Sequence, residues 1–306
     1  MKIIAKAATS TFKIFSSLPM ALLAALAYSL STVLVRKRLD ESNFFSACLV
    51  ITVVGNVILW PLTLLFINLR TVNLEGVLFF VLAGLLAPGV TRLLYFKGVE
   101  TVGVSVNTPV FATYPLYTSI LAVLLLGETL VLENWIGIIC IITGVVFIER
   151  SLAKPKTDPR KIPKKGLVFP LLATLTVAVS HIARKHGLNI YNEPLLGVAL
   201  GYFISFFLYI LLLTFHFSFT TQNSIFLGRD FRLFWKPGLC LSLGWLLAFH
   251  ALSIEKVSVV TPIIQTEPLF ILLFAYLYLK ELEHLTSKLI IGTLLIVIGV
   301  MLVSIR

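Results

Sequence analysis

The sequence predicts an all-α membrane protein with ten transmembrane helices, arranged as two inverted repeats of five helices. Hydrophobic residues make up 58% of the 306-residue chain and charged residues 13%, and the mean hydropathy is +0.99. A soluble domain contains only about 45–50% apolar residues. Two further observations support this fold class. The chain divides into ten apolar runs, and the second five runs repeat the first five.

Each run approaches the roughly 20 apolar residues that a helix needs to cross the hydrocarbon core of a bilayer. The runs begin near Leu18, Phe44, Val77, Val102, Asn134, Leu167, Leu195, Leu239, Val257 and Leu289. The fifth and the eighth are the weakest, because they are shorter or flanked by charge. We therefore expect a multi-pass integral membrane protein and place it in a bacterial inner membrane.

The net charge of +11 comes mostly from Lys and Arg residues next to the apolar runs. Such residues contact anionic lipid headgroups and set the topology of the helices. Because no soluble segment carries a basic stripe interleaved with aromatic residues, we expect membrane lipids as partners and no nucleic acid. The pattern does not fix an oligomeric state, and a monomer is compatible with it.

Residues that would indicate an enzyme or a metal site are missing from the sequence. Cys48, Cys140 and Cys240 lie singly in three different apolar runs, which is typical of packing residues. The chain has no H-E-x-x-H, no phosphate loop ending in G-K-[ST] and no G-x-S-x-G. We predict no enzymatic activity, no catalytic residue, no cofactor and no metal.

An internal duplication accounts for the five-plus-five organisation. Val104–Glu128 matches Val257–Glu281 in its V-S-V, T-P and T-x-P-L elements and in its final Glu. Leu22–Leu39 matches Leu171–Leu188 in the same way, so the first run corresponds to the sixth. Chance would rarely produce two such matches in order.

The duplication sets the domain boundaries. Residues 1–148 form the first repeat, 149–166 a basic linker and 167–306 the second repeat. Because five is an odd number, the second repeat must enter the membrane from the side opposite to the first. The two repeats are then inverted, an arrangement suited to transport by alternating access.

Prolines at matching positions predict helix breaks in both repeats. Pro109 and Pro115 in the first repeat correspond to Pro262 and Pro268 in the second. A proline inside a membrane helix leaves the carbonyl four residues earlier without its donor, which is tolerated only where protein or a wet cavity compensates. Matched interruptions in the two halves of a membrane protein indicate a transport site.

The motif P-x-x-x-x-x-L-A-x-L-x-L-G-E, followed by a Gly-rich closing helix, occurs twice. It reads P-L-Y-T-S-I-L-A-V-L-L-L-G-E from Pro115 and P-L-F-I-L-L-F-A-Y-L-Y-L-K-E from Pro268. Over nearly its whole length the chain resembles the EamA-like branch of the drug/metabolite transporter superfamily. Glu128 and Glu281, which end the two copies, are expected to cap helices or pair with loops.

The resemblance also implies that the first helix lines the central cavity. In place of the Trp-Gly that is common there, this chain has Tyr28 followed by Ser29, so Tyr28 becomes a candidate substrate-binding residue. For the topology, the resemblance implies cytoplasmic termini. The surplus of Lys and Arg on the linker side predicts instead that the linker is cytoplasmic. We favour cytoplasmic termini.

Glu267 is the main candidate for substrate or proton contact. It is the only charge between Lys256 and Lys280, and acids at such depth usually face a cavity or a partner. The alternative is a structural role, in which Glu267 stabilises the break beside Pro268. Its equivalent in the first repeat is Tyr114. Gln265 lies two residues before Glu267, on the opposite face of an ideal helix, and is a further candidate.

Four other polar residues lie in helices that the resemblance places around the cavity: Arg92, Lys97, His181 and His250. Lys97 and His250 occupy equivalent positions in the two repeats, and either could pair with Glu267 or bind a substrate carboxylate. Arg92 and Lys97 could instead extend towards headgroups from a helix end.

The resulting functional hypothesis is a secondary transporter that moves a small metabolite, an amino acid or similar, by alternating access and in the direction of export. Two alternatives remain open. One is a flippase for lipid-linked sugars, and the other is a membrane scaffold without transport activity.

Overall fold

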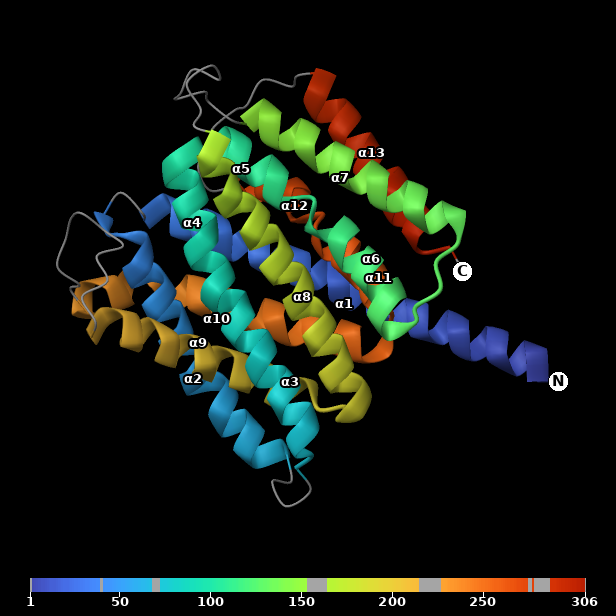
Figure 1. Cartoon of the computed structure of the whole chain (residues 1–306), viewed down its shortest axis with the longest axis horizontal. Coiled ribbons are helices and arrows are strands. Elements are labelled where there is room, and N and C mark those ends of the chain that lie inside the picture. Colours follow the sequence, from blue (N-terminus) through green and yellow to red (C-terminus); the bar gives the residue numbers. More distant parts are fainter. Residues whose placement is uncertain are drawn as a thin grey trace.

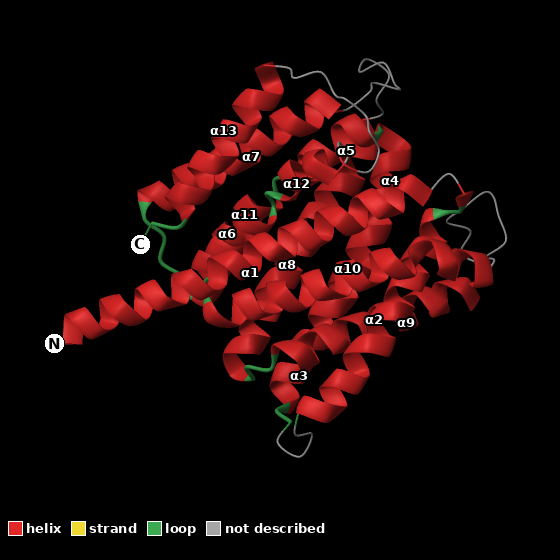
Figure 2. Ribbon diagram, turned by 180° about the vertical axis from the view of Figure 1, so that it is seen from behind, coloured by secondary structure: helices red, strands yellow, loops and turns green. Residues whose placement is uncertain are grey.

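The computed structural model describes residues 2–38, 41–67, 72–152, 164–214, 227–274, 277 and 287–305. For residues 2–16, 104, 105, 152, 164 and 227 only the backbone is described. All regular structure in these ranges is helical, with no strand (Figure 2). The all-α prediction is therefore confirmed.

The helices form one bundle (Figure 1). Those of the first repeat are α1 (Lys2–Arg38), α2 (Phe44–Phe66), α3 (Leu74–Gly84), α4 (Thr91–Val102), α5 (Val104–Phe111), α6 (Tyr114–Leu126) and α7 (Leu132–Leu152). Those of the second are α8 (Val168–Ile190), α9 (Pro194–Thr214), α10 (Leu227–Ile254), α11 (Val257–Ile264), α12 (Glu267–Phe274) and α13 (Ser287–Val303). A single 3₁₀ turn, Lys164–Leu167, precedes α8.

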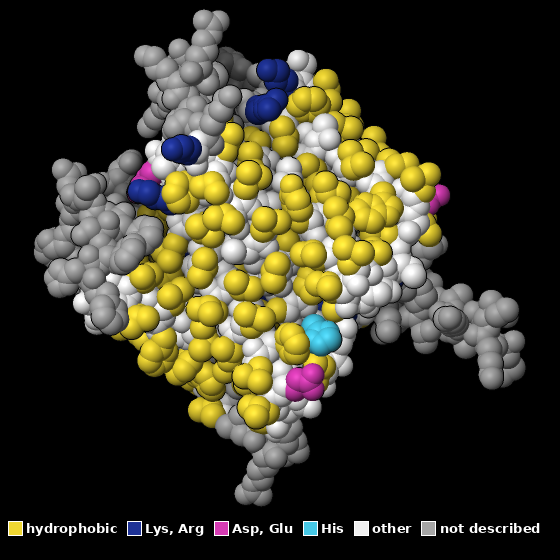
Figure 3. Space-filling model, in the orientation of Figure 1, with side chains coloured by type: hydrophobic (Ala, Val, Ile, Leu, Met, Phe, Trp, Pro, Cys, Tyr) yellow, Lys and Arg dark blue, Asp and Glu magenta, His cyan; other side chains and the backbone are white. Residues whose placement is uncertain are grey.

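Nine stretches of the described chain are long and apolar enough to cross a bilayer. Helix α13 is a tenth apolar helix but is shorter than these spans. Residues before it, including Lys280 and Glu281, lie outside the described ranges, so the tenth crossing stays a prediction. Hydrophobic side chains cover most of the face shown in Figure 3. Large hydrophobic residues are exposed in the described chain, among them Leu65 and Phe66 at 77% and 76%, which suits contact with lipid tails.

Helices α7 and α13 lie side by side at one edge of the bundle (Figures 1 and 2). Glycines allow this close approach. A Cβ atom on Gly144 would lie 2.6 Å from the carbonyl oxygen of Gly292, and one on Gly137 would lie 2.8 Å from that of Gly299. Small residues let the backbones of membrane helices meet in this way. The last helices of the two repeats thus pack directly against each other.

The fourth and ninth spans are each divided by a two-residue turn. Helix α5 ends at Phe111 and α6 begins at Tyr114, while α11 ends at Ile264 and α12 begins at Glu267. These four positions are equivalent in the duplication. The two spans are therefore interrupted at the same point.

Hydrogen bonding at the two turns is also the same. The Thr113 hydroxyl donates to the carbonyl of Val110 at 2.7 Å, and the equivalent Thr266 hydroxyl donates to that of Ile263 at 2.8 Å. One proline follows each turn, at the start of the next helix, where its missing N–H removes no intrahelical bond. These are Pro115 and Pro268. The other two, Pro109 and Pro262, lie inside α5 and α11.

A third break, which the sequence analysis did not predict, separates α3 from α4. The segment Leu85–Val90 is π-helical, and Ala87 within it is extended, with φ −145° and ψ 127°. Pro88 cannot donate a hydrogen bond, so carbonyls around it need other donors. The duplication gave no warning, because Pro88 has no proline at the equivalent position in α10.

Side chains of α8 and α9 satisfy the carbonyls of this α3–α4 break. Ser205 donates to the carbonyl of Gly84 at 3.1 Å, and Tyr209 donates to that of Pro88 at 3.0 Å. The carbonyl of Ala87 accepts from Arg184 at 2.6 Å. Non-helical backbone at membrane depth is tolerated where protein groups bond it in this manner.

Packing differs between the two ends of the bundle. One end, called here the terminus side, contains Ser17, Glu128, Val257 and Val303. The other end, called the linker side, contains the C-terminal end of α7 and the N-terminal end of α5. On the terminus side α6 packs against α11, and α8 packs against α10 and α11. The equivalent linker-side pairs, α5 with α12 and α1 with α4 and α5, have little or no contact among the described residues.

Candidate functional site

A hydrogen bond between the two repeats marks the centre of the candidate site. Glu267 is the first residue of α12, and its carboxylate accepts a 2.9 Å hydrogen bond from the hydroxyl of Thr32 in α1. The side chain of Glu267 is only partly buried. The break before α12 therefore places an acid at the contact between α12 and α1, a helix of the other repeat.

The equivalent positions in the other half also meet. Tyr114 is the first residue of α6, and its ring stacks on that of His181 in α8, with centroids 5.5 Å apart and planes inclined by 9°. Thr32 and His181 correspond when Leu22 is aligned with Leu171. The two repeats therefore form the same contact with different groups. It joins a carboxylate to a hydroxyl at Glu267 and Thr32, and a phenol to an imidazole at Tyr114 and His181.

Tyr28 lies one turn before Thr32 on α1 and is 9% exposed. Its ring centroid is 5.5 Å from that of Trp245 in α10. Gly244 makes room for the ring, because a Cβ atom there would lie 2.6 Å from it. Tyr28 and Tyr114 both interact electrostatically with Glu267 and with Arg184.

Arg184 was missed by the sequence reasoning. It is 1% exposed, and its guanidinium carbon lies 4.2 Å from the ring centroid of Trp245 and 5.5 Å from that of Phe249. In the alignment of the two repeats, Arg184 lies opposite Val35, so the duplication does not mark this position as basic. Helix α8 continues to Ile190, so Arg184 lies inside the helix and not at its end.

A small pocket lies where Arg184 meets the α3–α4 break. Its lining includes Ala87, Pro88, Tyr202, Trp245 and Phe249 together with Arg184. It therefore lies between the third helix of the first repeat and α8, α9 and α10 of the second.

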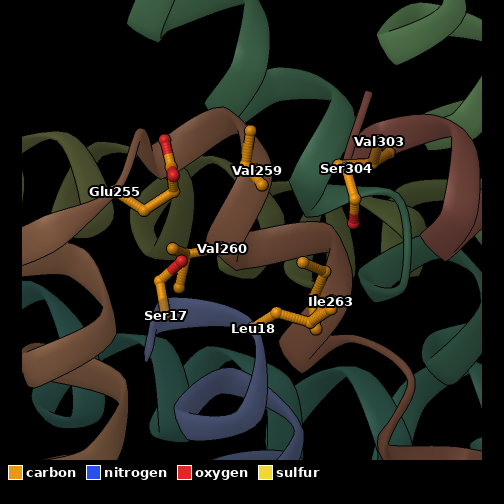
Figure 4. A pocket seen from close by; sticks show the side chains of 8 residues that line it. All are labelled: Ser17, Leu18, Glu255, Val259, Val260, Ile263, Val303 and Ser304. Carbon is orange, nitrogen blue, oxygen red and sulfur yellow. The ribbon is translucent and has the colours of Figure 1, made fainter. Parts of the chain in front are cut away.

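A second pocket lies on the terminus side (Figure 4). Apolar residues of α1, α11 and α13 form most of its wall, with Ser17, Glu255 and Ser304 as the polar members. Its lining includes no basic side chain.

Gln265, Lys97 and His250, which were also predicted as site residues, do not pair with Glu267. Gln265 is in the turn between α11 and α12. Lys97 pairs with Glu100 at 2.9 Å on its own helix, and the two side chains are 44% and 52% exposed. The Nδ1 atom of His250 lies 3.0 Å from the carbonyl oxygen of Leu246, one turn back.

Glu267 is thus paired with Thr32, while Lys97 and His250 have other partners. Arg92 of α4 interacts with Cys48 of α2 and Tyr209 of α9. It does not extend towards headgroups from a helix end in this structure.

Glu128 connects the two repeats on the terminus side. Its carboxylate accepts hydrogen bonds from the backbone N–H of Val257 at 2.8 Å and of Ser258 at 3.1 Å, and from the hydroxyl of Ser258. Lys256 donates to the carbonyl of Thr129 at 2.5 Å. Glu128 therefore caps the first turn of α11, where a helix presents free N–H groups. Its equivalent, Glu281, lies outside the described residues.

Groups of three or more His, Cys, Asp or Glu side chains that could hold a metal ion do not occur within the described ranges.

Comparisons with known proteins agree with the duplication. The model of the EamA-like transporter family matches residues 15–150 and again residues 164–305. A curated protein of Archaeoglobus fulgidus named uncharacterized transporter is 26% identical over 285 residues, covering 92% of this chain and 96% of its own. One solved crystal structure superposes with a TM-score of 0.74 at 14% identity, covering 94% of this chain and 96% of the other. That last likeness shows the fold alone.

Proposed function

Because the chain belongs to the EamA-like transporter family, we propose that it is a secondary transporter that moves a small metabolite across the membrane by alternating access. The energy would come from a gradient of a coupling ion or of the substrate itself. The observation that carries the proposal is the pair of equivalent helix breaks, each of which brings its first following residue, Tyr114 or Glu267, against a helix of the opposite repeat.

The uneven packing of the two ends supports alternating access. The described helices pack closely on the terminus side and loosely on the linker side. Two packings of an inverted repeat can be related by exchanging the roles of the halves, so that the closed end opens when the open end closes. We assign this conformation as closed on the terminus side.

Breaks at membrane depth favour a polar substrate. Glu267, Tyr114, Tyr28 and His181 form the central set of proposed binding residues. The remaining predicted residues, Gln265, His250, Lys97 and Arg92, would act at the edges of the pathway. An amino acid or similar metabolite fits the mixture of acid, aromatic and basic groups, and export is the proposed direction.

The described helices and the family make the protein an integral multi-pass membrane protein. A bacterial inner membrane remains a proposal, and the curated relative comes from an archaeon.

Counterflow into proteoliposomes tests the proposal. Vesicles with purified protein are loaded with unlabelled amino acids, sugars or nucleosides, and uptake of the labelled compound is measured. A transporter accumulates label for at least one class, and protein-free vesicles do not. Activity on lipid-linked sugars alone would indicate a flippase. No movement of any substrate would favour a scaffold and contradict the proposal.

A further inference from the structure

We propose that Arg184 is an anion-binding subsite that takes a carboxylate or phosphate group of the transported metabolite. This inference rests on the proposed transport function and names the chemical class of substrate for it. It assigns a binding role to a residue that neither the repeat pattern nor the helix breaks indicated.

The first argument is the charge of Arg184. An arginine side chain keeps its charge inside a protein. No described carboxylate forms an ion pair with it, and its electrostatic partners among the described residues are the neutral phenols Tyr28 and Tyr114. A charge buried without a counter-ion is costly at membrane depth, and such residues usually mark substrate or ion pathways.

The second argument is the number of donors left over. A guanidinium carries five N–H donors. The carbonyl of Ala87 accepts one at 2.6 Å, and the Nδ1 atom of His181 lies 3.5 Å from the other terminal nitrogen. The remaining donors have no acceptor among the described residues. A carboxylate or phosphate accepts two parallel N–H bonds from such a fork.

The third argument is the surroundings. Trp245 covers one face of the guanidinium and holds it in place, as a desolvated cation over an aromatic ring is stabilised. Arg184 lines the pocket at the α3–α4 break, together with Ala87, Trp245 and Phe249. The pocket thus offers a fixed cation to a ligand, and most of the residues in its wall are apolar.

A purely structural role for Arg184 does not account for the guanidinium N–H groups that have no acceptor. Bonding the Ala87 carbonyl needs one donor, and a serine or tyrosine does the same work at the neighbouring carbonyls of Gly84 and Pro88. The Ala87 carbonyl is bonded by a charged guanidinium, whereas hydroxyl groups bond the carbonyls of Gly84 and Pro88 in the same break.

Ligand-induced thermal stabilisation of the purified protein tests the subsite, since binding to the folded state raises apparent stability. The probes are pairs that differ in the anionic group: L-leucine with L-leucinamide, L-phenylalanine with L-phenylalaninamide, succinate with succinamide, and glycerol 3-phosphate with glycerol. Within at least one pair, we expect the anionic member to stabilise the protein and its partner to have little effect. The leucine, phenylalanine and succinate pairs report a carboxylate, and the phosphate pair reports a phosphate.

Three variants locate the effect. Arg184→Gln should raise the apparent Kd of the anionic probe about tenfold or more, as loss of a charge-assisted bidentate contact predicts. Arg184→Lys, which keeps the charge but not the fork, should give intermediate affinity and covers the case in which the Gln variant does not fold. Arg232→Gln is the matched control, because Arg232 is exposed near the start of α10 and should bind the probe as wild type does.

The inference is wrong if no anionic probe stabilises the protein, if the amides and glycerol stabilise it equally, or if Arg184→Gln binds the anion unchanged. Failure of the transport proposal looks different. In that case an anion binds through Arg184, but proteoliposomes accumulate none of the four anionic probes.

Discussion

The hydroxyl of Thr32 bonds the carboxylate of Glu267 at 2.9 Å, at the position where the imidazole of His181 stacks on Tyr114 in the other half. The duplication therefore preserved a contact between the first helix of one repeat and the broken helix of the other. It did not preserve the chemistry. Of the four side chains, Glu267 is the only carboxylic acid, and a carboxylic acid is the only one of them that is ordinarily an anion at neutral pH.

We predict that Glu267→Gln lowers transport while expression and thermal stability stay near wild type. The amide keeps the shape and can still accept from Thr32, but it cannot titrate or bind a cation. Loss of a hydrogen bond between the carboxylate and a cationic group of the substrate would cost about 1.5–3 kcal/mol, which corresponds to roughly 10–100-fold in rate. Counterflow across a pH series measures the effect, and the pH dependence of transport should disappear.

Other titratable groups near Glu267 set the control for this experiment. Glu149 of α7 interacts electrostatically with both Glu267 and Arg36, and Tyr28, Tyr95 and Tyr114 also lie within electrostatic reach of Glu267. Glu149→Gln should therefore leave a pH dependence that Glu267→Gln removes. If Glu267 is structural, its Gln variant transports normally at every pH. Glu267→Ala would then lower stability by about 0.5–1.5 kcal/mol, because the hydrogen bond to the exposed hydroxyl of Thr32 is lost.

The stack between Tyr114 and His181 gives a second prediction. His181→Phe keeps an aromatic ring against Tyr114, so thermal stability should stay near wild type. His181→Ala removes the stack and should cost about 0.5–1.5 kcal/mol beyond the loss of buried area. Both variants lose the imidazole beside Arg184, and both should transport less than wild type. Equal transport by His181→Phe and wild type would remove His181 from the binding site.

The helix breaks of the site could be predicted from the sequence, because their prolines occur at equivalent positions in both repeats. Pro109, Pro115 and their equivalents indicated breaks, and the structure interrupts both spans between the prolines of each pair. Glu267 was visible because it is a lone acid in an apolar run. Its pairing with Thr32 was not, because a single threonine in a helix carries no such signal.

Residues that occur in only one repeat were harder to find. Pro88 interrupts the third span without a counterpart, and Arg184 has no basic counterpart in the first repeat, where Val35 takes its place. Arg184 contacts this break through a 2.6 Å hydrogen bond from its guanidinium to the carbonyl of Ala87. This bond depends on how α8 packs on the α3–α4 break. No periodicity within one segment contains that information. The three-dimensional structure was needed to bring the two together.

Glu128 leads to a third prediction. Glu128→Ala removes the acceptor for the first N–H groups of α11, and loss of a helix cap costs about 0.5–2 kcal/mol. Because Glu128 belongs to one repeat and α11 to the other, the terminus side should also open more often. A cysteine placed at Val259, in a background with the three native cysteines replaced by alanine, should then react faster with a membrane-impermeant maleimide. Unchanged labelling would show that the cap stabilises α11 without holding that end closed.

The contact between α7 and α13 supplies the last prediction. Gly144→Ala would place a Cβ atom 2.6 Å from the carbonyl oxygen of Gly292, which is backbone and cannot turn aside. The helices must then separate, and overpacking of this kind costs about 1–3 kcal/mol. Gly228→Ala is the matched control. Gly228 is helical and a Cβ atom there meets nothing within 4 Å, so alanine should be neutral or stabilise the helix by up to about 1 kcal/mol. Thermal unfolding of the purified variants measures both effects. If Gly144→Ala unfolds at the same temperature as Gly228→Ala, then close backbone contact between α7 and α13 does not stabilise the fold.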